Sequence, residues 1–195
     1  SGELSEGTLI KKLLNSFYAI SVREASGQKI VANLLHRQVP LVLDPTLLLT
    51  KNDWKECFGL RFDQKYVLVY EVLNGTNLVE TAKRFAREKR IPLLCITSSN
   101  KPRVGMRCIK DAGPIQWLQL FAGSAYVFTN SFHGLAFSLL FEKQFAVELL
   151  PPPATTNARL IELLNMTGLS DRVISSDEMP GNSINFEEVR ACLTH

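Results

Sequence analysis

The residues best suited to chemistry form a short polar run, residues 129–134, which reads Thr-Asn-Ser-Phe-His-Gly. An apolar segment typical of a strand precedes this run, and an apolar segment typical of a buried helix follows it. The first turn of a helix attracts anions, because its backbone N–H groups are unpaired and it carries the positive end of the helix dipole. His133 falls in this turn, and Gly134 has no side chain, so a ligand can approach the backbone closely. We therefore predict an anion-binding and acid–base group made of Asn130, Ser131, His133 and Gly134.

A structural role is the alternative for the same run. Asn130 or Ser131 can simply cap a buried helix, and His133 can be a core histidine. Polar groups at the tip of a buried helix are costly, however, unless they have partners. An anionic ligand is one such partner, so the binding hypothesis stays beside the structural one.

Three charged residues lie near the ends of other predicted elements. Arg23 follows an apolar segment, where its guanidinium can bind a carboxylate or phosphate or can pair with a neighbouring carboxylate. Glu71 suits either a general base or the partner of a cation, and the sequence does not separate the two. Arg159, near the start of a predicted helix, is either a surface residue or a ligand contact. We include all three in the candidate site.

Strand-like and helix-like segments alternate along most of the chain and must position these residues. Strands are predicted at residues 17–22, 39–43, 66–72, 91–97, 104–109, 126–129 and 145–149. Helices are predicted at residues 24–38, 47–57, 77–90, 113–122, 131–142, 157–166 and 186–193. This alternation predicts an α/β fold with a doubly wound, mostly parallel Rossmann-like sheet and helices on both faces. Ligands bind outside the carboxyl ends of such strands, where the polar residues above are expected to gather.

Two helix starts carry recognisable capping residues. Asp44 precedes Pro45, which suits the first position of a helix, and Asn77 precedes a long amphipathic segment. The basic residues of that segment are interpreted as its solvated face: Lys83, Arg84, Arg87, Lys89 and Arg90.

The composition fits a globular domain and excludes several other classes. The chain has 195 residues, of which 46% are hydrophobic, and a formal net charge of +3. These values are unlike those of collagenous or disordered chains, and the small charge argues against a dedicated nucleic-acid binder. No apolar stretch reaches the roughly 18 residues that span a bilayer. We expect residues 1–195 to form a single Rossmann-like domain, the C-terminal part of a longer two-domain protein.

The cysteines and the missing motifs narrow the choice further. Cys57, Cys95, Cys108 and Cys192 form no C-x-x-C pair and no metal-ligand spacing with histidine, so we expect reduced, buried thiols and no metal site. We expect a cytoplasmic location, either free or peripheral at the inner membrane face. Dinucleotide-binding, P-loop and hydrolase-type glycine motifs are absent from the sequence, which removes the main support for those enzyme classes.

Several short motifs occur in an order that resembles the polysaccharide pyruvyl transferase family. They are Ser21-x-Arg23-Glu24, Asp44-Pro45-Thr46, Ser131-Phe132-His133-Gly134, Asn157-x-Arg159 and Gly168-Leu169-x-Asp171-Arg172. The resemblance runs from residue 17 through residue 172 and is to the C-terminal half of that family's members. It implies a GT-B-like architecture, in which two Rossmann-type domains face each other across a cleft.

The resemblance also implies an activity. Members of the family transfer the pyruvyl group of phosphoenolpyruvate to sugar hydroxyls as a ketal, on cell-surface or exopolysaccharide. At the matching positions, Arg23 would hold the carboxylate or phosphate of phosphoenolpyruvate, and His133 would be the acid–base or phosphate-contacting group. The implied partners are phosphoenolpyruvate as donor substrate, with no cofactor, and a sugar or lipid-linked oligosaccharide as acceptor. We expect an N-terminal domain to supply the remaining groups, and the isolated domain to be inactive.

Two other functions remain open at this point. The same architecture serves glycosyltransferases that use a nucleotide-sugar donor. Alternatively, the domain binds an anion or a carbohydrate without turnover.

Overall fold

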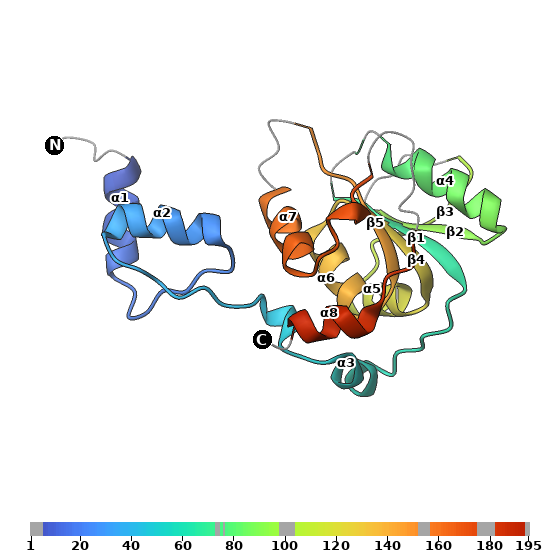
Figure 1. Ribbon diagram of the computed structural model, residues 1–195, viewed down its shortest axis with the longest axis horizontal. Helices are drawn as coiled ribbons and strands as arrows, with labels where there is room; N and C mark the ends of the chain where they lie inside the picture. The colour runs from blue at the N-terminus through green and yellow to red at the C-terminus, as the bar shows by residue number, and fades with distance from the viewer. Residues whose placement is uncertain are drawn as a thin grey trace. The chain divides into compact units, whose positions relative to one another are not determined.

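Figure 1 shows the computed structural model, which describes residues 6–72, 75, 77–97, 104–151, 157–174 and 182–193. The chain divides into two compact units, Ser1–Leu48 and Leu49–His195. The second unit contains the sheet and nearly all of the buried apolar side chains of the described residues.

A five-stranded parallel sheet forms the centre of the second unit. Its strands are β1 (Tyr66–Tyr70), β2 (Leu93–Thr97), β3 (Arg107–Lys110), β4 (Ser124–Thr129) and β5 (Gln144–Val147). They lie in the order β3-β2-β1-β4-β5, and every neighbouring pair is parallel. The chain therefore winds outward in both directions from β1 and β4, which confirms the predicted doubly wound α/β fold.

Helices cover both faces of this sheet (Figure 1). The helices of the unit are α3 (Lys51–Phe58), α4 (Leu78–Lys89), α5 (Pro114–Ala122), α6 (Phe132–Leu140), α7 (Asn157–Met166) and α8 (Phe186–Leu193), with a 3-10 turn η2 (Ser170–Arg172). On one face, Leu78 of α4 packs in a buried cluster with Val67 and Val69 of β1. On the other face, Tyr70 of β1 contacts the ring of Trp117 of α5. Alternate residues of β1 thus serve opposite faces, as the two-residue period of a strand requires.

The first unit contains two helices and a 3-10 turn. These are α1 (Glu6–Asn15), α2 (Ala25–Leu35) and η1 (Pro45–Leu47). Helix α1 was not predicted from the sequence. The helix predicted over residues 24–38 is too long, because His36 takes a left-handed conformation with φ 54° and ends α2. The predicted helix over residues 47–57 is also wrong at its start. Thr50 and Asp53 form a reciprocal capping box that begins α3 separately from η1.

Residues 17–22 and 39–43, predicted as the first two strands of the sheet, are not part of it. They make one isolated parallel bridge, between Val22 and Leu41. Pro40 has no backbone N–H, so it cannot extend the ladder on its side of the bridge. These segments are apolar, but an apolar run becomes a strand only where a partner strand is available.

Two of the four cysteines form a disulfide, which corrects the expectation of reduced, buried thiols. Cys95 of β2 lies directly opposite Cys108 of β3, with the two Cα atoms 4.5 Å apart, and their sulfur atoms are bonded. Cys57 is free and exposed, not buried. The side chain of Cys192 lies outside the described part of the structure. Sequence spacing did not reveal the disulfide because it depends on the register of two neighbouring strands.

Candidate functional site

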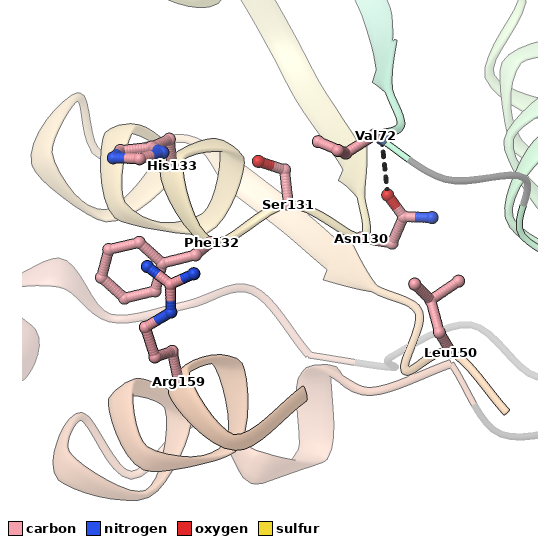
Figure 2. A pocket seen from close by; sticks show the side chains of 7 residues that line it. All are labelled: Val72, Asn130, Ser131, Phe132, His133, Leu150 and Arg159. Carbon is pink, nitrogen blue, oxygen red and sulfur yellow. Dashed lines mark hydrogen bonds between the residues drawn. The ribbon is translucent and has the colours of Figure 1, made fainter. Parts of the chain in front are cut away.

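A cavity of about 150 Å³ opens beside the carboxyl ends of β1 and β4. Its lining residues, drawn in Figure 2, are Val72, Asn130, Ser131, Phe132, His133, Leu150 and Arg159. The strand order reverses between β1 and β4, so the cavity occupies the place where doubly wound folds bind ligands. Its volume is below the roughly 300–1,000 Å³ of pockets for drug-sized molecules, and suits a small metabolite.

Hydrogen bonds from the end of β4 fix one wall of this cavity. The hydroxyl of Thr129 donates to the carbonyl oxygen of Tyr70 at 2.6 Å. The side-chain oxygen of Asn130 accepts from the backbone N–H of Val72 at 2.9 Å, the dashed line in Figure 2. Asn130 is buried, so its amide replaces a backbone ladder where the two strands separate. Asn130 thus has a structural role in addition to lining the cavity.

The start of α6 forms the next part of the wall. Ser131 is the N-cap residue of α6, and its Oγ accepts from the backbone N–H of Gly134 at 3.3 Å. The capping role considered for Ser131 is therefore confirmed. Gly134 is buried and does not line the cavity; a Cβ atom there would lie 2.2 Å from Oγ1 of Thr129. The absence of a side chain at Gly134 lets α6 pack against β4, which gives a physical reason for glycine different from close approach of a ligand.

A cation and two aromatic rings complete the wall. The guanidinium carbon of Arg159, from α7, lies 5.2 Å from the centre of the Phe132 ring. The ring of Phe132 in turn lies 5.5 Å from that of His133. Arg159 and His133, far apart in the sequence, thus both lie close to the same aromatic ring (Figure 2). A cation–π contact orients the guanidinium, and an imidazole nearby can exchange a proton with a bound ligand.

Two carboxylates lie just after strand ends at the same edge of the sheet. Glu71 directly follows β1 and is half-buried, but it is not among the lining residues. Glu148 directly follows β5 and is 3% exposed. Its Oε1 accepts from the backbone N–H of Asn77 at 2.6 Å, whereas the side chain of Asn77 makes no capping hydrogen bond. The acceptor at the start of α4 therefore comes from Glu148, a residue that the sequence analysis missed.

Arg23 belongs to the Ser1–Leu48 unit, and the described lining of the cavity does not include it. Its guanidinium pairs with the carboxylate of Asp44, with an N···O distance of 2.5 Å. Burial alone would raise the pKa of Asp44, but hydrogen bonds from the backbone and hydroxyl of Thr46 and from Arg23 outweigh burial and lower it. Asp44 also caps η1, as predicted, by accepting from the N–H of Thr46. The neighbouring-carboxylate role considered for Arg23 is therefore present in the structure.

The apolar part of the lining could not have been selected from the sequence. Val72, Phe132 and Leu150 resemble ordinary core residues, and an apolar residue type by itself does not indicate a ligand. The useful signal was position, because Val72 and Leu150 each follow a strand by two or three residues. Among the described residues, no group of three or more His, Cys, Asp and Glu side chains is placed to hold a metal ion. None of the helices found in the described ranges has the length and hydropathy to cross a membrane.

A comparison with protein-family models matches residues 5–147 to the family described as polysaccharide pyruvyl transferase. The match covers well over half of the 195 residues. The chain belongs to the polysaccharide pyruvyl transferase family. A search of curated proteins found no match.

Membership of this family of transferases agrees with the predicted resemblance, but the residues matched differ from the range over which the resemblance was predicted. The family match begins before residue 17, where the resemblance was expected to start, and ends with β5. The cavity residues from Val72 to His133 lie within the matched range of the pyruvyl transferase family. Leu150 and Arg159 lie beyond it, so only the tertiary structure brings Arg159 to the part of the site that the family match covers.

Proposed function

We propose that this chain is the donor-binding domain of a polysaccharide pyruvyl transferase and binds phosphoenolpyruvate in the cavity beside β1 and β4. The arrangement that carries the proposal is Arg159 and His133 beside the same ring, that of Phe132, at the first turn of α6. Phosphoenolpyruvate has two anionic groups, a phosphate and a carboxylate. A guanidinium binds either group through two hydrogen bonds, and the N-terminus of a helix favours anions.

The proposed reaction places definite demands on the site. A proton adds to the methylene carbon of phosphoenolpyruvate, one sugar hydroxyl oxygen bonds to the central carbon, and a second hydroxyl of the same sugar displaces the phosphate. The two hydroxyl protons are balanced by the one gained at the methyl carbon and the one carried by the departing phosphate. In this scheme His133 transfers a proton and Arg159 stabilises charge on the phosphate. Asn130 and Ser131 hold the wall against which the donor lies.

Other groups must act on the acceptor, because one imidazole and one guanidinium do not supply every step. We assign acceptor binding, of a sugar or lipid-linked oligosaccharide destined for cell-surface or exopolysaccharide, to a second domain in a GT-B-like arrangement. Arg23 remains a proposed ligand of the phosphate or carboxylate, and Glu71 a proposed base. For Arg23 to bind the donor, its ion pair with Asp44 would have to open.

Binding of phosphoenolpyruvate to the 195-residue chain tests the donor assignment. We expect phosphoenolpyruvate to raise the melting temperature, and Arg159→Met to weaken its binding by about tenfold to a hundredfold, the effect of losing a charged hydrogen bond. His133→Ala should reduce ketal formation by the full-length enzyme more than it reduces donor binding. Arg61→Met, at an exposed position outside the cavity, is the matched control and should bind normally.

The glycosyltransferase alternative gives a different result in the same assay. If UDP- or GDP-sugars raise the melting temperature and phosphoenolpyruvate does not, the donor assignment is wrong. If phosphoenolpyruvate binds but full-length enzyme with His133→Ala forms ketal at the normal rate, donor binding stands and the role of His133 in proton transfer does not.

A further inference from the structure

A second hollow lies at the opposite edge of the sheet, where strands begin. It is a groove of about 610 Å³. One side is α4 from Glu80 onward, continued by Arg90, and the others are residues 91–93, which lead into β2, and residues 104–105, which precede β3. Since α4 runs back from the carboxyl edge of the sheet, its C-terminal end reaches the amino edge. The groove is thus separate from the cavity proposed to bind phosphoenolpyruvate.

Cations of α4 line this groove. Lys83, Arg87 and Arg90 contribute to its wall, with Glu80 as the carboxylate among them. Glu80 pairs with Lys83 at 2.8 Å, and Arg87 donates from Nε to the backbone oxygen of Lys83 at 3.2 Å. Arg87 and Arg90 are both exposed and both line the groove. The groove therefore has a net positive charge.

The floor and rim of the groove are apolar. Ala86 and Leu93 are buried at its base, and the side chain of Val104 at its rim is 85% exposed. Gly105 follows with φ 83°, and a Cβ there would lie 3.8 Å from Cε of Lys83. A large exposed apolar side chain therefore stands beside a row of cations. Interfacial binding to anionic lipid uses this combination, with the cations on headgroup phosphates and the apolar residue at the acyl boundary.

We propose that this groove docks the chain on an anionic phospholipid surface, with Arg87 and Arg90 on lipid phosphates and Val104 inserted at the interface. The groove is open to solvent, whereas a small soluble ligand is usually bound in a site that encloses most of its surface. An exposed valine at the rim is stabilised by transfer into an apolar phase. The helix dipole also stabilises cations near a helix C-terminus, and this effect explains in part why Lys89 and Arg90 lie there. It does not account for the exposed Val104 beside them. The inference does not depend on the proposed donor.

Binding of the 195-residue chain to phospholipid vesicles tests this docking. We expect flotation with vesicles of phosphatidylcholine mixed with phosphatidylglycerol, and none with phosphatidylcholine alone. The charge reversal Arg87→Glu with Arg90→Glu should weaken binding more than tenfold, because each cation near such a surface contributes about one tenfold step or slightly less. Val104→Ser should weaken it several-fold, and this loss should persist when salt is raised above about 0.15 M.

Two control variants keep the test independent of total charge and of folding. Lys55→Glu with Arg61→Glu makes the same change of net charge at exposed positions away from the groove. If this pair weakens flotation as much as the groove pair, total charge drives binding and the proposal is overturned. Arg90→Gly removes one guanidinium at a residue with φ 54°, a conformation that glycine prefers. It should retain the melting temperature of the parent chain and still bind vesicles less well.

Soluble phosphate provides the remaining comparison. We expect inorganic pyrophosphate, titrated by calorimetry without lipid, to bind the parent chain no more tightly than it binds the groove pair, the variant with Arg87→Glu and Arg90→Glu. Tight pyrophosphate binding that disappears in the groove pair would show a site for a soluble phosphorylated ligand and would overturn the membrane assignment. Absence of flotation with phosphatidylglycerol would also overturn it.

Discussion

Lys143 shows at the scale of one residue how tertiary structure controls a charge. The residue is 2% exposed, and its Nζ donates to the backbone oxygens of Ala122 at 2.5 Å and Ser124 at 2.9 Å. These carbonyls lie where α5 ends and β4 begins. Burial, assisted by the positive charge of Lys51, lowers the pKa of Lys143 from its ordinary 10.5 to about 8. An uncharged amine still has two hydrogens for the two carbonyls, so deprotonation keeps both bonds.

The lowered pKa predicts that stability depends on pH above 8. Between pH 8 and 10 the folded chain releases the proton of Lys143 while the unfolded chain retains it, so the free energy of unfolding rises with pH through this group. From pH 8 to pH 10, we expect the free energy of unfolding of the parent chain to rise by on the order of 2 kcal/mol relative to that of Lys143→Met. Urea unfolding of both proteins at several pH values measures this difference.

Two tyrosines limit the pH range over which stability rises. Burial raises the pKa of Tyr66 and Tyr126 to about 12, so above pH 10 these groups lower stability as the unfolded chain ionises first. Lys55→Met, at an exposed position, is the control and should show no such difference. A parent-minus-variant difference that stays constant from pH 8 to 10 would contradict the lowered pKa.

At the scale of elements, Glu148 connects three of them at the edge of the proposed donor site. Its backbone N–H donates to the oxygen of Thr129 at the end of β4, and its carboxylate accepts from Asn77 at the start of α4. A negative charge at the N-terminus of a helix is also favoured by the helix dipole. Gly75 lies so close that a Cβ there would be 1.8 Å from Oε2 of Glu148. The absence of a side chain at Gly75 thus leaves room for this carboxylate.

Removing the carboxylate should loosen the start of α4. We expect Glu148→Ala to lower the free energy of unfolding by about 1–3 kcal/mol, since a backbone donor loses its partner, and Glu148→Gln to cost less. Hydrogen exchange of the first turn of α4 should accelerate in the alanine variant. Glu80→Ala, in the same turn but on the surface, is the control and should change stability by less than about 1 kcal/mol.

Gly75 allows a second check of the same contact. Gly75→Ala should destabilise the parent chain through collision with Glu148, but it should cost much less in the Glu148→Ala background. Equal costs in the two backgrounds would show that the two residues do not interact, and would contradict the close approach.

At the scale of the molecule, the two units differ greatly in the core that they contain. The sheet and its covering helices lie within Leu49–His195. In Ser1–Leu48, the described buried apolar residues are Val31 and Val39, while Phe17 and Tyr18 are exposed. Burial of apolar surface is the main favourable contribution to folding. A unit as small as Ser1–Leu48 buries little apolar surface.

This difference predicts independent folding of the larger unit. A chain of residues 49–195 should unfold cooperatively on heating, with helix and strand signals in circular dichroism, whereas residues 1–48 should show no cooperative transition. Calorimetry of the two fragments measures the outcome. An unfolded 49–195 fragment would mean that its sheet depends on contacts from outside the unit.

The sequence by itself determined the local elements of this protein. Period-two and period-3.6 apolar patterns located β1, β2, β4 and β5 to within a few residues, and Ser131 was correctly considered as a cap. The order of short motifs also indicated the family, and the family match agrees. These features are local, because they depend on residues a few positions apart or on their order along the chain.

The tertiary structure alone decided what depends on distant partners. Residues 17–22 have the composition of a strand but lack a partner in the sheet, and Cys95 meets Cys108 only through the register of β2 and β3. Likewise, Arg159 reaches Phe132 because α7 packs on α6, and Glu148 reaches Asn77 because β5 lies beside β4. Pairing, register and packing join groups separated by many residues, and no pattern within a short stretch of sequence specifies which distant groups will meet.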